Sequence, residues 1–266
     1  IFWKPFNMNI SKLSTTSKQL VANGSYAAAI KMKPQYTYLM SDGTTGFFKE
    51  TTQGGGSKTP IALVIDANQR MAIALKNANG GAPMQWCSIN YSNTQTNVHG
   101  ISNVYKAYPY TGDPGRDPTS GKDETYNASY TTPAITGNKV KGQNSDFPAF
   151  YAAAHYNPGV VYTGSPTLQW YLPSANDWMQ MKTVAFWNMV PVTYDNPSAG
   201  CYFHLFDTAF TQVGGNNISS INFWTSTEIY PSQAIFYRMV GFSGPETSWK
   251  NNPYSVYNKV RAFVTY

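Results

Sequence analysis

The sequence FWTSTE at residues 223–228, together with KVRAFVTY at residues 259–266, decides the fold. Apolar residues recur in both segments and in AIFYRMVG at residues 234–241, and short runs rich in aromatic and β-branched residues are typical of strands. Residues 248–257 lie between them and are rich in Trp, Asn and Tyr, which no strand pattern requires. We therefore expect short strands that fix the fold and an exposed loop over 248–257 that carries large amphipathic side chains.

The composition is poor in charge and rich in aromatic residues. Of 266 residues, 12% are charged and 15% are aromatic, including 20 Tyr and 7 Trp. This excludes a disordered polyampholyte, and the length predicts one or two folded domains with a real core. The net charge is +6, but the 19 Lys and Arg are scattered. Neutralising a nucleic-acid backbone takes clustered cations, so nucleic acid is not an expected partner.

Compartment and redox state follow from what the sequence lacks. No stretch approaches the roughly 20 apolar residues of a membrane span, so no membrane insertion by this segment is expected. The sequence begins at Ile1 without a signal peptide, and we expect the numbering to start inside a longer protein or after processing. Cys87 and Cys201 leave one disulfide or two buried thiols as alternatives, and they exclude a zinc site built on cysteines. Many Asn, Thr and Tyr with few charges favour an exported protein of a cell surface, the extracellular space or a virion surface.

Two apolar runs predict the central strands. Residues 60–65 and 71–75 flank a polar turn, and near-continuous apolar character is typical of a hairpin buried on both faces. Residues 1–35 alternate partially around an Asn-Gly turn, which predicts a short β-rich segment. This segment is either the end of a preceding domain or an extension of the main domain, residues 36–266.

Two helices are expected after the hairpin. The first covers about residues 146–156, with Pro148 in its first turn. The second begins after Ser174, and Asp177 completes an acidic variant of the capping box, while Trp178 lies on the apolar face. Strands, then helices, then short strands with long loops between them predict an α+β fold with small antiparallel sheets.

Residues 113–124 form an acidic, turn-rich segment. Its oxygen ligands raise the question of calcium, but their spacing does not follow an EF-hand loop. The four residues are Asp113, Asp117, Asp123 and Glu124. A solvated loop is the favoured interpretation, and neither a metal ion nor a cofactor is predicted.

Three motifs in order resemble those of a known fold family. They are WYLPSANDW at 170–178, FWTSTE at 223–228 and KVRAF at 259–263. They are similar to the pattern W-Y-L-P-S-x-x-E-W, Y-W-S-S-T-E and R-V-R-x-F of bacterial and phage domains with the C-type-lectin-like fold. That group includes formylglycine-generating enzymes and variable proteins diversified by retroelements. The resemblance covers about residues 36–266 and implies this fold, with two helices, although Asp177 stands for the usual Glu and Thr225 for a Ser.

The motif residues also have structural interpretations. Trp224 is expected to pack in the core, while Ser226 and Glu228 are expected to satisfy backbone donors where the strand ends. We expect Arg261 to pair with Glu228, because a partly buried carboxylate needs a partner.

Catalysis is not predicted. His99, His155 and His204 are far apart in the sequence and share no metal-ligand spacing. Formylglycine-generating enzymes use a pair of nearby active-site cysteines, and the contexts of Cys87 and Cys201 do not match. No two acidic residues stand out as the pair that glycoside hydrolysis needs.

The resemblance places an exposed ligand-binding face in the C-terminal region, where the retroelement-diversified members also vary. Tyr, Trp, Asn and Ser give a large contact area and adaptable hydrogen bonding. The candidate ligand-binding residues are Tyr230, Ser232, Gln233, Phe236, Arg238, Trp249, Asn251, Asn252, Tyr254 and Tyr257. The expected function is non-catalytic binding of a protein or glycan on another cell or surface. The alternatives are a tip or stalk module of a surface assembly, a formylglycine-generating-enzyme-like enzyme, and polar loops without a ligand.

Overall fold

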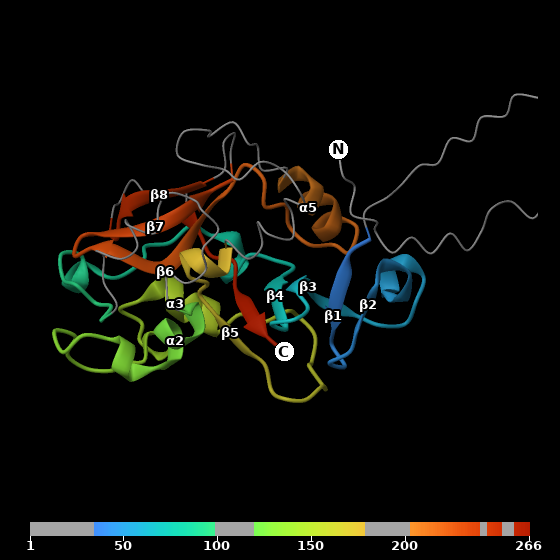
Figure 1. The fold of residues 1–266 in the computed structure, drawn as a ribbon, viewed down its shortest axis with the longest axis horizontal. Helices are drawn as coiled ribbons and strands as arrows, with labels where there is room; N and C mark the ends of the chain where they lie inside the picture. Colours follow the sequence, from blue (N-terminus) through green and yellow to red (C-terminus); the bar gives the residue numbers. More distant parts are fainter. Residues whose placement is uncertain (1–34, 99–119, 179–202, 240–243, 252–257) are drawn as a thin grey trace, which may run out of the picture. The chain divides into compact units, whose positions relative to one another are not determined.

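Two β-sheets and a few short helices make up the computed structural model (Figure 1). The model describes residues 35–98, 120–178, 203–239, 244–251 and 258–266, which belong to one compact unit. The mixed α+β class is confirmed. The β-rich segment predicted over 1–35 lies outside the described residues except for Gln35.

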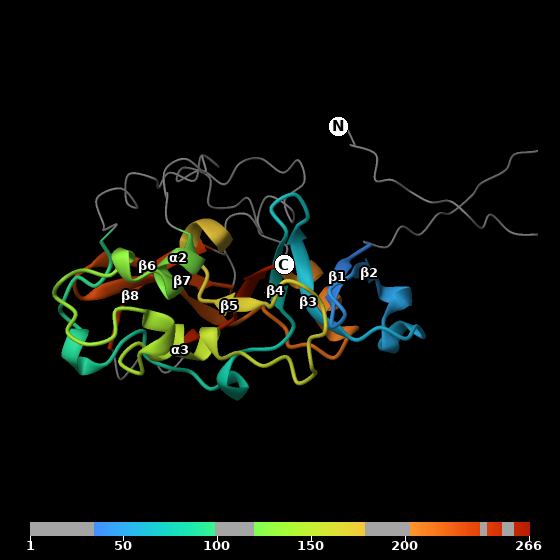
Figure 2. The same ribbon diagram turned by 90° about the horizontal axis from the view of Figure 1, so that it is seen from below.

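The first sheet has six strands in the order β2-β1-β3-β4-β10-β5. They are β1 (Thr37–Met40), β2 (Thr45–Phe47), β3 (Pro60–Asp66), β4 (Met71–Ala74), β5 (Gln169–Tyr171) and β10 (Phe263–Thr265). The predicted hairpin is confirmed, since β3 and β4 pair in antiparallel fashion (Figure 2). β10 lies between β4 and β5 and pairs with both, although these strands are far apart in the sequence.

The second sheet has four strands in the order β8-β7-β6-β9. They are β6 (Asn222–Tyr230), β7 (Gln233–Arg238), β8 (Gly244–Trp249) and β9 (Asn258–Lys259). β6, β7 and β8 are antiparallel neighbours, and β9 runs parallel to β6. The prediction of a loop from residue 248 is therefore wrong for Ser248 and Trp249, which are in β8 because they pair with β7. Residues 252–257 of that predicted loop lie outside the described residues.

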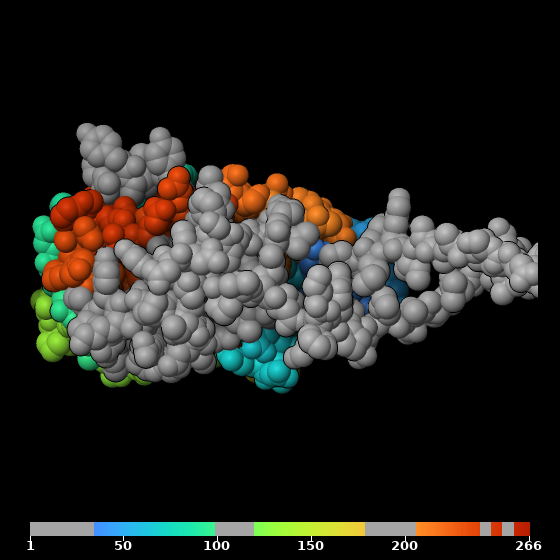
Figure 3. Space-filling model, turned by 45° about the horizontal axis from the view of Figure 1, so that its top comes forward, coloured from blue at the N-terminus to red at the C-terminus, as the bar shows by residue number. Residues whose placement is uncertain are grey.

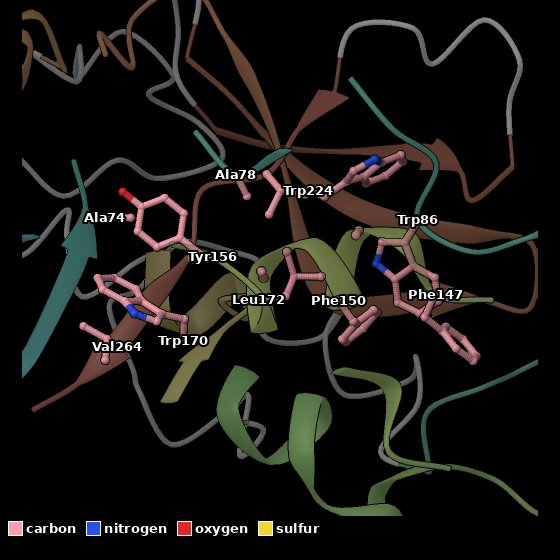
Figure 4. Close-up of a cluster of buried hydrophobic side chains, with 14 of the residues drawn as sticks. Ala74, Ala78, Trp86, Phe147, Phe150, Tyr156, Trp170, Leu172, Trp224 and Val264 are labelled. Atoms are coloured by element: carbon pink, nitrogen blue, oxygen red, sulfur yellow. The ribbon is translucent and has the colours of Figure 1, made fainter. Parts of the chain in front are cut away.

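Alternation along much of the strands of the first sheet creates two hydrophobic cores. One cross-strand row packs with helix α5 (Phe203–Thr211), and the next row packs with helix α3 (Pro148–Ala154). The first row consists of Leu63, Ile73, Phe263 and Tyr171, and the second consists of Val64, Ala72, Val264 and Trp170. Trp224 is fully buried, as predicted, in the second core (Figure 4).

The helix signals in the sequence are also confirmed. Pro148 begins α3, which is shorter than the predicted 146–156. Residues 175–178 are helical, and the capping box is present. The Asp177 backbone N donates to Ser174 Oγ at 3.1 Å, and the Ser174 N donates to Asp177 Oδ2 at 2.8 Å. Trp178 stacks on Phe223 at 5.5 Å between ring centroids, which places it in the first core.

The remaining elements are short. They are helix α2 (Gly121–Tyr126) and the 3-10 turns η1 (Phe48–Glu50), η2 (Thr52–Gly54), η3 (Asn79–Gly81), η4 (Ile89–Tyr91), η5 (Ala128–Tyr130) and η6 (Lys141–Gln143). Asp123 and Glu124 are in α2, and Glu124 is buried, so this end of the acidic segment is not a solvated loop. Asp113 and Asp117 lie outside the described residues.

Candidate ligand-binding site

The register of the second sheet brings three candidate residues into one row. Tyr230 of β6 pairs with Gln233 of β7, and Gln233 pairs with Trp249 of β8. Directly opposed residues project from the same face of a sheet. Tyr230 is 44% exposed and Trp249 is 54% exposed, and Gln233 is partly exposed. These three residues are called the exposed row, and Figure 3 shows the C-terminal strands, orange to red, reaching the surface at one end.

Ser232 and Asn251 flank the exposed row. Ser232 is in the two-residue turn between β6 and β7, and Asn251 is in the turn that follows β8; both are partly exposed. The Lys250 backbone N donates to Ser232 O at 2.9 Å, which ties the end of β8 to this turn. Asn252, Tyr254 and Tyr257 lie outside the described residues.

Phe236 does not belong to the site. It is only 7% exposed and packs edge-on against Trp224, with ring centroids 6.2 Å apart. Phe236 lies opposite Trp224 in the register of β6 and β7, so its side chain points into the second core. The sequence did not reveal this because β7 is buried on both faces and has no polar-apolar alternation to read.

Arg238 is exposed but lies away from the row. It is five residues from Gln233 along β7, which corresponds to about 16 Å in an extended strand. Its Nη1 forms an ion pair with Glu246 Oε1 at 3.2 Å, and both side chains are about half exposed, at 49% and 45%. Arg238 is therefore a surface ion-pair residue at the other end of β7.

A buried ion pair holds the strand ends beneath the exposed row. Glu228 Oε1 accepts a hydrogen bond from Lys250 Nζ at 2.6 Å, and both side chains are fully buried. The Glu228 carboxylate also accepts from the backbone N of Thr96 at 2.8 Å and of Asn97 at 2.6 Å. Glu228 is two residues before Tyr230, and Lys250 directly follows Trp249. The ion pair therefore holds the backbone next to the two outer residues of the exposed row.

The Lys250 ammonium has a second acceptor and an aromatic ring beside it. Besides Glu228, its Nζ donates to Thr94 O at 2.7 Å and lies 5.1 Å from the ring centroid of Trp86. Lys250 is not among the residues that the sequence predicts to be functional. The available signal was that Lys250 is the only Lys or Arg between residues 239 and 258, within a segment otherwise free of cations.

The predicted pairing of Arg261 with Glu228 is wrong. Arg261 Nη2 donates to the backbone carbonyls of Asn216 at 2.6 Å and Asn217 at 3.3 Å, and its guanidinium lies 4.8 Å from the Phe210 ring centroid. Burial lowers the pKa of Arg261 to about 9. Arg261 therefore holds the turn that precedes β6, and the carboxylate it was expected to meet is occupied by Lys250.

Cys87 is a free, fully buried thiol, and burial raises its pKa to about 12. The structure thus has Cys87 as a buried thiol rather than in a disulfide, and Cys201 lies outside the described residues. A raised pKa opposes thiolate formation, and the thiolate is the reactive species. Among the described residues no group of three or more His, Cys, Asp or Glu is arranged to hold a metal ion.

Cys87 is expected to resist modification in the folded protein. In a Cys201→Ser background, a thiol with a pKa of about 12 is about one part in ten thousand thiolate at pH 8, and it has no access to reagent. We expect negligible reaction with a disulfide reagent until guanidinium unfolds the chain, followed by one equivalent of reaction. Fast stoichiometric reaction of the folded protein contradicts this environment for Cys87.

None of the helices formed by the described residues combines the length and the hydropathy that a membrane crossing requires. In comparisons with known proteins, no family model, no curated protein and no solved structure matches this chain.

Proposed function

We propose that residues 36–266 form a non-catalytic ligand-binding domain with the C-type-lectin-like fold, of adhesin or receptor type. The observation that carries this proposal is the exposed row, which presents two large aromatic side chains and an amide on one face of the second sheet. The fold assignment is supported by the motifs, because 170–178 and 259–263 contribute the adjacent strands β5 and β10.

The exposed row has the chemistry of a recognition surface. Tyr and Trp supply rigid contact area with few rotatable bonds, and an amide both donates and accepts hydrogen bonds. The ion pair between Glu228 and Lys250 holds the backbone beneath the row. Ligand binding therefore needs little further ordering of this backbone, which lowers its entropic cost. These properties favour a protein or glycan ligand on another cell or surface. A domain that binds such a ligand is itself expected on a cell surface, a virion surface or in the extracellular space.

The proposal includes diversification of this region by a retroelement. Its support is the resemblance of the motifs to diversified variable proteins, together with the arrangement of rigid Glu228 and Lys250 beneath exposed residues. Genomic copies of the codons for residues 223–266 test it. Substitutions confined to adenine-bearing codons for exposed residues, beside a reverse transcriptase gene and a template repeat, support diversification, whereas uniform substitution contradicts it.

One observation favours a second candidate function, a tip or stalk module. β8 is an edge strand in the part of the second sheet that the structure describes, and an unpaired edge can accept a strand from a neighbouring subunit. In that case the exposed row is covered within an assembly. Formylglycine-type chemistry is not proposed, because the environment of Cys87 suppresses its thiolate.

Trp249→Ala is expected to weaken binding about 30-fold or more without destabilising the fold. A central aromatic contact is worth about 2 kcal/mol or more, whereas the exposed side chain of Trp249 leaves little packing to lose. The ligand is first found by screening the purified chain on glycan arrays and on whole cells, and affinities are then measured by titration.

Phe47→Ala is the matched control, since Phe47 is also an exposed aromatic residue at 37% but lies in β2, at the opposite end of the structure (Figure 1). It is expected to change neither binding nor the melting temperature. Unchanged affinity of Trp249→Ala, or a large drop in its melting temperature, argues against the exposed row as the binding site.

A further inference from the structure

A second buried polar cluster adjoins Glu228 and consists of Lys141, Asn97 and Glu124. All three side chains are at most 1% exposed. Lys141 Nζ donates to Asn97 Oδ1 at 2.7 Å, and Asn97 Nδ2 donates to Glu124 Oε1 at 2.9 Å. The cluster thus places an amine on the carbonyl side of a carboxamide and a carboxylate on its nitrogen side. It takes no part in the exposed row.

The orientation of the Asn97 carboxamide is fixed by several contacts. Its Nδ2 also donates to Ser226 O at 2.9 Å, and the backbone N of Asn97 donates to Glu228. The nitrogen side therefore faces two acceptors, and the oxygen side faces the ammonium. Lys141 Nζ lies 2.7 Å from Asn97 Oδ1, and a C=O bond is about 1.23 Å long. The distance from Lys141 Nζ to Asn97 Cγ is therefore no more than about 3.9 Å.

Two opposing influences act on the Lys141 ammonium: the faces of nearby aromatic rings attract it, and burial lowers its pKa. Its Nζ faces the rings of Phe147 and Phe150, at 5.8 and 5.4 Å from their centroids. Burial lowers the pKa of Lys141 to about 8, although the charges of Glu124 and Glu228 act in the opposite direction. A neutral amine carries a lone pair and is a nucleophile, so burial makes the reactive form of Lys141 accessible near neutral pH.

The local backbone brings Lys141 to this position. Lys141 begins η6, and a Cβ on the following residue, Gly142, would lie 2.8 Å from Thr125 Cγ2 and 2.9 Å from Ala154 Cβ. Only a glycine allows η6 to pack this closely against α2 and α3. Asn97 is positioned from the other side by its β-bridge to Thr131.

We propose that Lys141 and Asn97 form an intramolecular isopeptide bond, with Glu124 as the general acid–base. Lys141 Nζ first gives a proton to Glu124 along the hydrogen bonds through the Asn97 carboxamide, from Nζ to Oδ1 and from Nδ2 to Glu124 Oε1, and the neutral amine attacks Asn97 Cγ. The Cγ–Nδ2 bond then breaks as Glu124 returns the proton to Nδ2. A second proton follows the same route from Nζ, so that Nδ2 leaves as ammonium and Glu124 ends as the carboxylate it was at the start.

The reaction balances without any other reagent. One ammonium side chain and one carboxamide become one secondary amide and one ammonium ion, with no change in oxidation state. The product links residues 44 positions apart, and it removes the buried positive charge of Lys141 from the protein. This inference does not depend on the identity of the ligand or on the exposed row.

The mass of the intact chain tests the bond. We expect the purified, folded protein to be lighter than its sequence by one ammonia. A protease digest is expected to yield a branched peptide that joins the segment containing Asn97 to the segment containing Lys141. In a denaturing gel the chain is expected to run differently from a variant without the bond, because the cross-link persists after unfolding.

Two conservative variants serve as controls. Lys141→Arg keeps a buried cation, and Glu124→Gln keeps the shape of the side chain; both are expected to show the full sequence mass, with folding checked by circular dichroism. If either residue had only a structural role, its substitution would alter the stability, but neither the wild type nor the variant would be lighter than its sequence. The full sequence mass in the folded wild type overturns the proposal, whichever way the variants fold.

One side reaction also releases ammonia and needs its own control. Asn23-Gly24 and Asn79-Gly80 are sequences at which a succinimide can form. A succinimide opens in mild base and does not depend on Lys141, whereas the isopeptide bond withstands mild base. A mass deficit of one ammonia that persists in Lys141→Arg, or that mild base converts by adding one water, overturns the proposal.

Discussion

Glu228→Gln is expected to lower the free energy of unfolding by about 3–5 kcal/mol, the range observed when one partner of a buried ion pair is removed. The substitution leaves the Lys250 ammonium fully buried without its counter-charge. It also replaces one carboxylate oxygen by an NH₂ group. That oxygen faces the backbone N–H groups of Thr96 and Asn97, which donate to Glu228 at 2.8 and 2.6 Å. Those two donors and Lys250 Nζ, three in all, would then compete for the one remaining acceptor oxygen.

Denaturant unfolding monitored by tryptophan fluorescence measures this loss. Glu246→Gln is the matched control, because its partner Arg238 is exposed and exposed ion pairs contribute less than about 1 kcal/mol. Adding Lys250→Met to Glu228→Gln is expected to recover part of the loss, since both buried charges are then gone. If Glu228→Gln and Glu246→Gln both lowered the free energy of unfolding by the same small amount, the structural role of the buried pair between Glu228 and Lys250 would be contradicted.

Trp224→Ala is expected to cost about 3–5 kcal/mol, as large-to-small substitutions of buried aromatic residues do. Trp224 is fully buried in the core shown in Figure 4, where it packs against Phe236. Its Nε1 donates to Met84 O at 2.7 Å, so the substitution also leaves a carbonyl without that donor. Cavity formation and the lost hydrogen bond act in the same direction.

The matched control for Trp224→Ala is Trp249→Ala in the same sheet. It removes the same side chain from a position that is 54% exposed, and the denaturation midpoint is expected to change little. A Trp224→Phe variant is expected to fall between the two, because it fills most of the cavity but has no N–H donor. Equal midpoints for both alanine variants would contradict the burial pattern of β6.

The features that the sequence predicted correctly are governed by neighbouring residues. The hairpin of β3 and β4 follows from two apolar runs and the turn between them. The capping box of Ser174 and Asp177 involves residues three apart. Pro148 at the start of α3 is favoured by its own ring geometry. None of these features depends on a distant part of the chain.

The features that the sequence did not reveal depend on distant partners. Glu228 was expected to meet Arg261, but its backbone donors come from residues 131 and 132 positions away. No periodicity encodes such a separation. β8 was missed because it reads Gly-Pro-Glu-Thr-Ser-Trp, which has little strand propensity, and its strand form comes from pairing with β7.

The exposed row could be predicted only in part. The residue types of Tyr230 and Trp249 indicated exposure and recognition, but their alignment depends on an irregularity in the register. Glu228 pairs with Ala234, and the next pair is Tyr230 with Gln233, with a register shift between them. A shift of one residue exchanges the two faces of a strand, so without it Tyr230 would point away from Gln233 and Trp249.

The position of β10 between β4 and β5 has a consequence for the order in which the domain folds. The hairpin of β3 and β4 can form as soon as both strands leave the ribosome, whereas β5 joins this sheet only through β10. Contacts between such distant residues, as between Val264 and Ala72, slow folding because a long chain segment must be closed first. Synthesis therefore leaves β5 without its partner β10 until Phe263 to Thr265 emerge, so the first sheet is completed only after all of residues 37–265 have been made.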